Sequence, residues 1–442
     1  MATGARYFDP DRAAELTGDT AALLNRRQHV LGSAYRLFYD EPLHLVRGDG
    51  VHVYDADGVE YLDCYNNVPV IGHAHPAVTA AVAAQLGRLN THTRYLHEGI
   101  VDYSEALLAT LPAELGRVML SCSGSEAGDL ALRLAKARTG NTGVIVTRSA
   151  YHGVTTETAA VSPSLGGLAS LPSWVRVVAA PDALRVDHAA AGYPSLGAWF
   201  AAEVAAAADD LTERGHGVAA LLLDSIFASD GVLPGPAGLL APAVEVVHRA
   251  GGLYVADEVQ AGFARTGAQL WGFTRHGVVP DIVTMGKPMG NGMPIAATVL
   301  RPEISDDLGR QVRYFSTFGG NPVCVAAAQT VLDVITADDL PQHSADVGRY
   351  LLRALRELAL PAIGEVRGAG LFLGVELVRP DGSPDAATAR AAVNELRRRR
   401  VLTGTTGPSD NVLKLRPPLP FSTADADRLV TELVATLTAL TS

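Results

Sequence analysis

The chain has 442 residues, of which 48% are hydrophobic, and a formal net charge of -11 at pH 7. This length predicts two or three domains with a large buried core, and the acidic balance opposes binding to the phosphates of nucleic acids. No apolar run approaches the roughly 20 residues of a membrane span, and the first residues lack the apolar core of a signal peptide. We therefore expect a cytoplasmic protein with no nucleic-acid or membrane partner.

The three cysteines (Cys64, Cys122 and Cys324) are scattered along the chain without the spacing of metal ligands. Such a pattern argues against a disulfide framework and against a zinc site. We expect reduced, mostly packed thiols and no bound metal.

The first predicted element is a hairpin-like segment, VHVYDADGVEYLDCY, with a turn at residues 55–58. Apolar residues alternate with polar ones beside that turn, which is typical of two antiparallel strands. We expect residues 1–70 to form an N-terminal segment that packs with a small C-terminal domain.

From about residue 117 to residue 300, short aliphatic runs alternate with helical patterns, which predicts a mostly parallel α/β sheet. We assign this region to a large domain of residues 71–325. An Ala-rich segment, AWFAAEVAAAADDLTERG, is one of its expected helices. The expected strands lie at residues 118–120, 144–146, 219–223, 253–256 and 282–285.

A long helix expected at residues 323–334 leaves this sheet, and a smaller α/β pattern follows it. We assign residues 326–442 to a small domain. It is expected to contain helices at residues 347–358 and 387–400, strands within 370–378 and 411–416, and a closing helix from Thr423.

The segment SCSGSEAGDLALRLAKARTG follows the first expected strand and opens a helix that Gly140 ends. Gly124 lets backbone amides approach a ligand closely, Ser125 adds a hydroxyl, and the helix dipole favours an anion. The segment therefore predicts a phosphate site. Taken alone, it also fits an ordinary capping box from Ser123 to Glu126.

Two adjacent acids, Asp257 and Glu258, follow the strand at residues 253–256. They lie at its carboxyl end, where open α/β sheets bind their ligands. One such acid could simply cap a turn. Because there are two, we expect one to face the cleft and the other an internal arginine.

Lysine is rare in this chain, because the 36 Lys and Arg residues include only Lys136, Lys287 and Lys414. An amine can lose its proton and attack a carbonyl, whereas a guanidinium effectively cannot. Lys287 follows the strand at residues 282–285, one strand after Asp257. We expect Lys287 to be a catalytic amine that meets Asp257 in one crevice.

Two further segments point to that crevice, AYHG with the ring of Tyr151 and STFGGNP with a hydroxyl before a glycine turn. Pyridoxal 5'-phosphate requires an anion cradle, a stacking ring, a carboxylate that keeps the pyridine nitrogen protonated, and a lysine that forms an imine. The sequence supplies all four in order. It therefore predicts pyridoxal 5'-phosphate as the cofactor.

The segments SGSEA, AYHG, ADEVQAGFARTG, DIVTMGKPMGNGMP and STFGGNP resemble, in order and spacing, the class III aminotransferases. The resemblance spans essentially the whole chain. It implies the α/β fold type I of pyridoxal-phosphate-dependent transferases, in which a large domain has a mostly parallel seven-stranded sheet flanked by helices. A smaller α/β C-terminal domain is joined by the N-terminal segment.

The same resemblance implies roles for single residues. Lys287 would be the Schiff-base lysine and general base, and Asp257 would pair with the pyridine nitrogen. Gly124 and Ser125 would hold the cofactor phosphate.

Four further cofactor contacts are implied in the same way. Val259 would lie under the cofactor ring, Tyr151 would stack on its other face, and Gln260 would reach its phenolic oxygen. Thr317 would complete the phosphate site from the neighbouring subunit. This last contact implies a homodimer with shared active sites.

Within the family, LDCYNNVPVIGHAHP and NVLKLRPPLPFS look closest to the ethanolamine-phosphate phospho-lyase branch, whose near relatives are the alanine-glyoxylate aminotransferases. Many class III members carry an arginine three residues before a Pro-Pro pair, where it grips a carboxylate with two bonds. Here that position is Lys414, and Arg416 directly precedes Pro417. The lysine favours a substrate other than a plain α-carboxylate, although it could be a surface charge at a strand end.

A second departure is DSIFASDG at residues 224–231, where many members have an EPxQGEG-like run. Asp224 replaces the first glutamate, and Ser229 stands at the position of the second, which in some members masks the carboxylate-binding arginine. Without that switch, dual-substrate transamination is less favoured, while other transaminases stay open.

The leading hypothesis is elimination of phosphate from O-phosphoethanolamine or a similar phosphorylated amine. Arg94, Lys414 and Arg416 are candidates for binding the substrate phosphate, although Arg94 could equally pair with a structural acid. The alternative is an ω-aminotransferase that uses pyruvate or glyoxylate as acceptor. Racemisation is a third possibility, and a non-catalytic cofactor sensor would need a helix-turn-helix module that the sequence does not show.

Four histidines are expected to have structural roles rather than to tune the site. They are His73, His75, His152 and His216.

Overall fold

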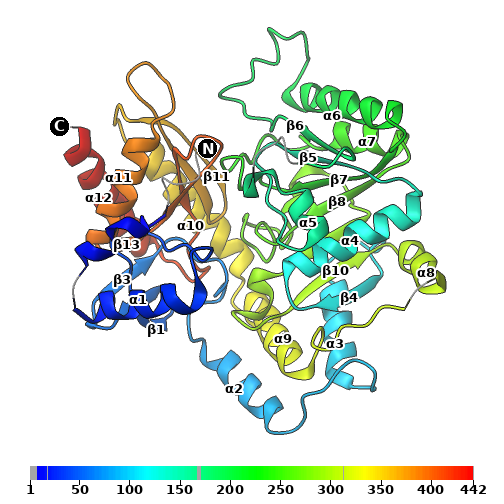
Figure 1. Cartoon of the computed structure of the whole chain (residues 1–442), viewed down its shortest axis with the longest axis horizontal. Helices are drawn as coiled ribbons and strands as arrows, with labels where there is room; N and C mark the ends of the chain where they lie inside the picture. Colours follow the sequence, from blue (N-terminus) through cyan, green and yellow to red (C-terminus); the bar gives the residue numbers. More distant parts are fainter. Residues whose placement is uncertain (1–6, 17, 167–170, 312, 442) are drawn as a thin grey trace.

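A computed structural model of the chain describes residues 7–16, 18–166, 171–311 and 313–441. Two lobes lie side by side, with the N-terminal and C-terminal parts together in one lobe and the middle of the chain in the other (Figure 1). Among the described residues, no helix is both long enough and apolar enough to cross a membrane.

The large lobe is built on a seven-stranded sheet in the order β4-β10-β9-β8-β7-β5-β6. Only β10 runs antiparallel to its neighbours, so the sheet is mostly parallel, as predicted. All five expected strands fall inside observed ones, whereas the sequence pattern does not predict β6 or β10. The strands are β4 (Arg117–Ser121), β5 (Gly143–Thr147), β6 (Val175–Val178), β7 (Val218–Asp224), β8 (Leu253–Asp257), β9 (Ile282–Met285) and β10 (Ala296–Leu300).

Helices cover both faces of this sheet because side chains of the central strands point alternately to the two sides. Ala220 and Leu222 of β7 pack in one core with residues of α4, while Leu221 and Leu223 pack in the other with α6 and α7. Strands buried on both faces read as continuous apolar runs. The helices are α2 (Pro76–Leu86), α3 (Glu98–Leu108), α4 (Gly124–Thr139), α5 (Thr156–Ala160), α6 (Leu196–Glu213), α7 (Ala241–Arg249), α8 (Pro302–Gln311) and α9 (Pro322–Ala337), with short turns η2 (Pro163–Leu165), η4 (Gly272–His276) and η5 (Lys287–Gly290).

The small lobe holds two four-stranded sheets, β1-β2-β3-β13 and β11-β12-β15-β14. The predicted hairpin is formed by β2 and β3, and β3 pairs in parallel with β13, so both ends of the chain share one sheet. The domain boundaries at residues 70 and 325 stay a prediction. The elements are β1 (Leu45–Asp49), β2 (His52–Asp55), β3 (Glu60–Asp63), α10 (Leu340–Arg356), β11 (Ile363–Ala369), β12 (Phe372–Leu377), α11 (Ala386–Arg398), β13 (Val401–Leu402), β14 (Gly404–Thr406), β15 (Val412–Leu415) and α12 (Thr423–Thr441).

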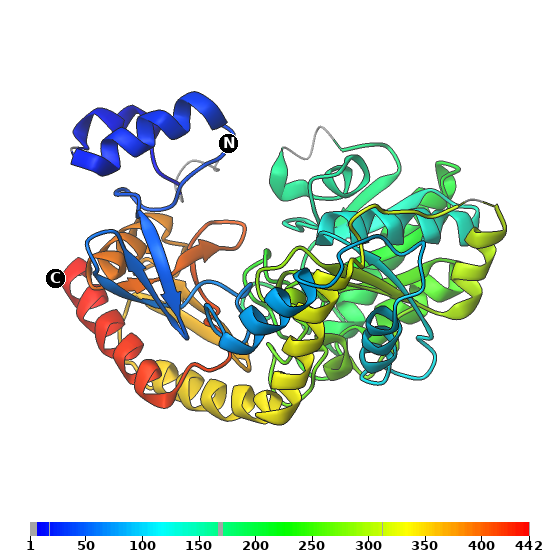
Figure 2. The same cartoon turned by 90° about the horizontal axis from the view of Figure 1, so that it is seen from below.

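The first described residues form η1 (Pro10–Glu15) and α1 (Gly18–Leu31), which stand over the small lobe (Figure 2). The amide of Phe8 donates to the carbonyl of Leu37 at 2.7 Å, and the ring of Tyr7 stacks on that of Phe38 with centroids 5.9 Å apart. These contacts hold residues 7–8 against residues 37–38.

A buried group of charges joins the two lobes at Glu376 of β12. The Glu376 carboxylate is fully buried and pairs with Arg185 of the large lobe and Arg367 of β11. Arg367 also donates to the carbonyls of Gly231 and Val232, which follow β7. Burial alone would raise the pKa of Glu376, but the two arginines lower it below its usual value.

Removing Glu376 should therefore leave two arginines without their shared carboxylate. We expect Glu376→Ala to lower the free energy of unfolding by about 3–5 kcal/mol, the loss typical of breaking a buried ion pair. Glu365→Ala is a matched control, because Glu365 also contacts Arg367 but is one-third exposed; its loss should stay under about 1 kcal/mol. Urea unfolding measures both, and equal losses would contradict a special role for Glu376.

Candidate active site

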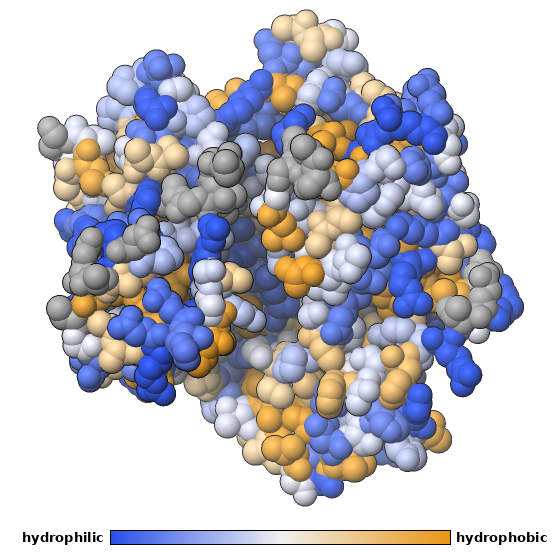
Figure 3. Space-filling view, viewed as in Figure 1, coloured by the Kyte–Doolittle hydropathy of each residue, from blue (hydrophilic) through white to orange (hydrophobic). Residues whose placement is uncertain are grey.

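The carboxyl ends of β4, β5, β8 and β9 meet at one edge of the seven-stranded sheet, where a pocket opens. The space-filling view shows a hollow between the lobes (Figure 3). All seven residues predicted to bind the cofactor within one chain line the pocket. The complete lining is Gly124, Ser125, Tyr151, His152, Gly153, Asp257, Val259, Gln260 and Lys287.

Lys287 enters this pocket from the turn that follows β9. Its backbone has φ of +29°, in the left-handed region that non-glycine residues seldom adopt. A Cβ on Gly286 before it would lie 3.2 Å from the amide nitrogen of Gly124, so a side chain there would crowd the start of α4. Burial, followed by the positive charge of Arg416, lowers the pKa of Lys287, which favours the neutral amine.

Asp257 ends β8 and faces the pocket. Its Oδ1 accepts a hydrogen bond from the amide of Val259 at 3.0 Å, and its Oδ2 lies 2.6 Å from Nδ1 of His152. An ionised carboxylate can only accept, so Nδ1 carries the proton when Asp257 is charged. Both oxygens are held, which fixes the carboxylate.

His152 corrects the expectation that it is a purely structural histidine. Its buried ring contacts Asp257, and its amide donates to Oγ of Ser162 at 2.8 Å. Its Nε2 is buried and has no hydrogen-bond partner within the described ranges. The position directly after Tyr151, already predicted to face the cofactor, was the signal for this role.

Glu258 faces away from the pocket, as expected, but its partner is not an arginine. Its carboxylate accepts hydrogen bonds from the hydroxyl of Ser225 and from the amides of Gly272 (2.7 Å) and Phe273 (2.9 Å). Neutral donors offset burial less than a positive charge does, so burial raises the pKa of Glu258 to about 7.

The start of α4 is both a capped helix end and one wall of the pocket. Oγ of Ser123 accepts from the amide of Glu126 at 3.2 Å, and the Glu126 carboxylate accepts from the amide of Cys122 at 2.8 Å. The capping interpretation is therefore correct, yet Gly124 and Ser125 also line the pocket. A Cβ on Gly124 would lie 3.0 Å from a methyl carbon of Val259, so a larger residue would crowd this wall.

These residues fit pyridoxal phosphate. A helix N-terminus with a glycine suits the phosphate, a fixed carboxylate suits the pyridine nitrogen, and a buried amine suits the aldehyde. Tyr151 and Val259 offer surfaces for the two faces of a flat ring.

Lys414 and Arg416 lie on β15 and just after it, and both are buried. Nζ of Lys414 is 3.3 Å from Oε1 of Gln260, and the Arg416 guanidinium donates to the same oxygen. Arg416 also donates from Nε to the carbonyl of Tyr65 at 3.0 Å. The alternative of a surface charge at Lys414 is therefore wrong.

Asp224 lies beside Asp257, because the two residues are in register between β7 and β8. Its carboxylate accepts from the amides of Ile226 (3.0 Å) and Ala228 (3.1 Å). Burial, followed by the negative charge of Asp257, raises the pKa of Asp224.

Four predicted site residues do not line the pocket of this single chain. Lys414 and Arg416 reach its lining through Gln260, whereas Arg94 and Thr317 lie further away. The Arg94 guanidinium is exposed and stacks on the ring of Phe315, with its central carbon 3.7 Å from the ring centroid. Thr317 is exposed two residues further along that loop. Their roles toward substrate and cofactor stay predictions.

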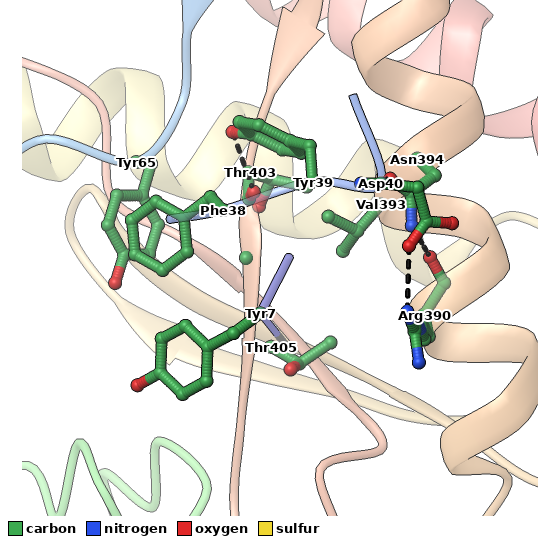
Figure 4. A pocket seen from close by; sticks show the side chains of 11 residues that line it. Tyr7, Phe38, Tyr39, Asp40, Tyr65, Arg390, Val393, Asn394, Thr403 and Thr405 are labelled. Carbon is green, nitrogen blue, oxygen red and sulfur yellow. Dashed lines mark hydrogen bonds and ion pairs between the residues drawn. The ribbon is translucent and has the colours of Figure 1, made fainter. Parts of the chain in front are cut away.

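A second, small cavity has Tyr65 in its wall (Figure 4). Its walls include Tyr7, Phe38 and Tyr39, and Phe38 meets the Tyr65 ring edge-on at 5.2 Å. The Tyr65 ring also contacts Arg416, whose guanidinium lies 5.0 Å from the ring centroid. The cavity wall thus supports a residue that holds Arg416.

The sequence pattern of the family described as Aminotransferase class-III matches residues 38–437. The chain therefore belongs to the class III aminotransferases, which are pyridoxal-phosphate-dependent enzymes, and the predicted family, fold class and cofactor are confirmed.

Particular relatives are similar over almost their whole lengths. An alanine-glyoxylate aminotransferase 2-like protein of Drosophila melanogaster is 40% identical, covering 97% of this chain and 89% of its own. Ethanolamine-phosphate phospho-lyase homolog 1 of Caenorhabditis elegans is 38% identical over 96% of each chain. The solved structure of a phospholyase from Arthrobacter in complex with phosphoethanolamine has a TM-score of 0.91 and 43% identity, covering 94% of this chain and 99% of that one.

The raised pKa of Glu258 has a consequence for stability. The folded protein holds the Glu258 proton up to about pH 7, while a glutamate in the unfolded chain loses it near pH 4.5. Its contribution to stability is therefore complete below pH 4.5 and is lost as the pH rises to about 7. Between these pH values the free energy of unfolding of wild type should fall by up to about 3 kcal/mol, at about 1.4 kcal/mol per pKa unit. The Glu258→Gln variant has no proton to lose at this position, so it should not show this fall.

Urea unfolding at fixed protein concentration across this pH range tests the prediction. Exposed Glu245 on α7 provides the control, because Glu245→Gln should leave the pH dependence of wild type unchanged. A Glu258→Gln curve parallel to that of wild type would contradict the prediction.

Proposed function

We propose that this enzyme is a phospho-lyase that acts on O-phosphoethanolamine or a similar phosphorylated primary amine. The observation that carries the proposal is the pair of buried cations, Lys414 and Arg416, beside Gln260 at the pocket of Lys287. Two buried positive charges held against a residue that lines a pocket favour an anionic group on the ligand. The similarity to a phospholyase in complex with phosphoethanolamine supports the same substrate class.

A phosphate monoester suits these two cations better than a carboxylate does. It carries three acceptor oxygens and a charge near two, so a lysine and an arginine can each take an oxygen. Lys414 replaces the forked guanidinium that matches two carboxylate oxygens. The pair therefore binds the phosphate and turns the amine of the substrate toward Lys287.

The chemistry begins with proton removal by Lys287. When bound, pyridoxal phosphate withdraws electrons from the carbon that carries the substrate nitrogen. Neutral Nζ of Lys287, favoured by its lowered pKa, takes the proton from that carbon. Asp257 is held by His152 and the Val259 amide, and in this position it would pair with the pyridine nitrogen of the bound cofactor.

Loss of that proton is balanced by departure of phosphate from the neighbouring carbon. The carbon–oxygen bond breaks and its electron pair leaves with the phosphate, whose charge Lys414 and Arg416 balance. Addition of one water then gives acetaldehyde, ammonia and phosphate from phosphoethanolamine. No second substrate is needed.

The second candidate is an ω-aminotransferase that passes the amino group to pyruvate or glyoxylate. Relatives with alanine-glyoxylate aminotransferase names support it, at 40% identity for the Drosophila melanogaster protein. Arg416 would then bind the carboxylate of the acceptor. This reaction leaves phosphate esters intact and requires a keto acid.

Assembly as a homodimer is also part of the proposal. Exposed apolar side chains gather on the segments 86–96 and 314–318, including Tyr95 (66% exposed), Leu96 (102%) and Phe318 (70%). The two segments touch, because the rings of His92 and Phe315 are 5.6 Å apart. Orange side chains mark the lower end of the molecule around α2 and α9 (Figure 3). A second copy would cover this patch and receive Thr317 at its cofactor phosphate. The cytoplasmic location stays a prediction.

The function is tested by incubating the purified holoenzyme with O-phosphoethanolamine in the absence of any keto acid. We expect release of equal amounts of phosphate and acetaldehyde, and no release by Lys287→Ala. Lys414→Met should lower kcat/KM about 10- to 100-fold, because a hydrogen bond to a charged group contributes about 1.5–3 kcal/mol. Activity that depends on pyruvate, with no phosphate released, would establish the aminotransferase instead.

Lys136→Met is the matched control for that substitution. Lys136 pairs with Glu157 at 2.6 Å and lies over the ring of Trp174, and neither partner lines the pocket, so its loss should leave kcat/KM unchanged.

The assembly is tested by sedimentation velocity. We expect wild type to sediment as a dimer, and Phe318→Glu to sediment as a monomer because a charge would be buried in the contact. Leu440→Glu on α12 places the same charge at an exposed site outside the patch and should stay dimeric. A monomeric wild type with full activity would contradict both the dimer and the shared site.

A further inference from the structure

The carboxamide of Gln260 links the pocket of Lys287 to the two buried cations. Its Oε1 accepts from both Lys414 Nζ (3.3 Å) and the Arg416 guanidinium. Its backbone carbonyl accepts from Nδ2 of Asn67 at 3.2 Å, which anchors the main chain at this position. This bond holds the main chain from which the carboxamide projects.

A neutral oxygen is a weak partner for this site. Arg416 is only 6% exposed, and no carboxylate of the described residues lies within 4.0 Å of it. A buried charge is costly unless it is paired, and an amide dipole compensates it less than an anion does. Burial lowers the pKa of Arg416, because the charged guanidinium is disfavoured away from water.

We propose that Oε1 of Gln260 is a placeholder that occupies the anion position between Lys414 and Arg416 and must leave before the anionic group of a substrate can bind. Gln260 is thus a specificity-determining residue for the proposed phospho-lyase reaction, on which this inference rests. A substrate amine that carries no anionic group cannot displace the amide oxygen of Gln260 from the two cations. A phosphate dianion can, because it offers several oxygens and full charges in place of one dipole.

The placeholder also keeps the cations in place between turnovers. Two like charges that share one oxygen repel each other, and a dipole directed at both reduces that repulsion. With Oε1 between them they stay aligned for the next anion. The same arrangement sets a limit on affinity, because each anion that binds must first break two hydrogen bonds from charged donors.

The test measures binding of inorganic phosphate to the holoenzyme by isothermal titration calorimetry at constant ionic strength. Gln260→Met keeps the side-chain length but removes the competing oxygen, and should bind phosphate about tenfold more tightly. Gln260→Glu puts a carboxylate between the cations, and should bind phosphate at least about tenfold more weakly. The cofactor absorption of each variant verifies that its pocket is loaded.

Gln342→Glu is the matched control, because Gln342 lies exposed on α10 and should leave phosphate affinity unchanged. Phosphate affinities of Gln260→Met and Gln260→Glu equal to that of wild type would overturn the placeholder. If either variant fails to fold, as shown by its thermal midpoint, the other decides the question.

The outcomes separate this inference from the proposed function. If wild type releases phosphate from phosphoethanolamine but the Gln260 variants bind phosphate as wild type does, only the placeholder is wrong. If wild type neither binds phosphate nor releases it, both proposals are wrong.

Discussion

The parallel alignment of β7, β8 and β9 is the constraint on which the active site depends. Asp224 is in register with Asp257, and Asp257 with Thr284, so the three strands end together at one edge. The chain must turn at that edge, and the turns carry the reactive groups. Lys287 and Asp257 therefore meet, although η4 and β9 separate them in the sequence. Strand β5 brings Tyr151 and His152 to the same edge.

Environment then gives adjacent, chemically similar residues different properties. Asp257 has both oxygens fixed by a histidine and an amide, whereas Glu258, one residue later, is buried among neutral donors and has a pKa of about 7. Lys287 has a lowered pKa because burial and Arg416 both oppose its charge. The pocket thus combines a fixed carboxylate with an amine that readily loses its proton.

The small lobe contributes the two buried cations that contact Gln260. Lys414 and Arg416 reach Gln260 of the large lobe, so the relative position of the lobes sets the geometry of the anion site. The charge cluster at Glu376 holds that position, since Arg367 binds both Glu376 and the backbone after β7. The position of the two cations and the contact between lobes are therefore coupled.

Local pattern in the sequence was sufficient for the strands β4, β5, β7, β8 and β9, though not for the parallel strand β6. It was also sufficient for the Gly124, Asp257 and Lys287 turns, because buried strands and ligand turns have strong composition signals. It was insufficient for β10, an antiparallel strand inserted between β4 and β9, and for the His152 contact with Asp257, since both depend on pairing between distant segments. The sequence by itself determined the family, the cofactor and the position of Lys287 in the pocket. Only the tertiary structure decided that Lys414 is buried, that Glu258 lacks an arginine, and that Gln260 lies against two cations, because burial and charge balance are set by neighbours far apart in the chain.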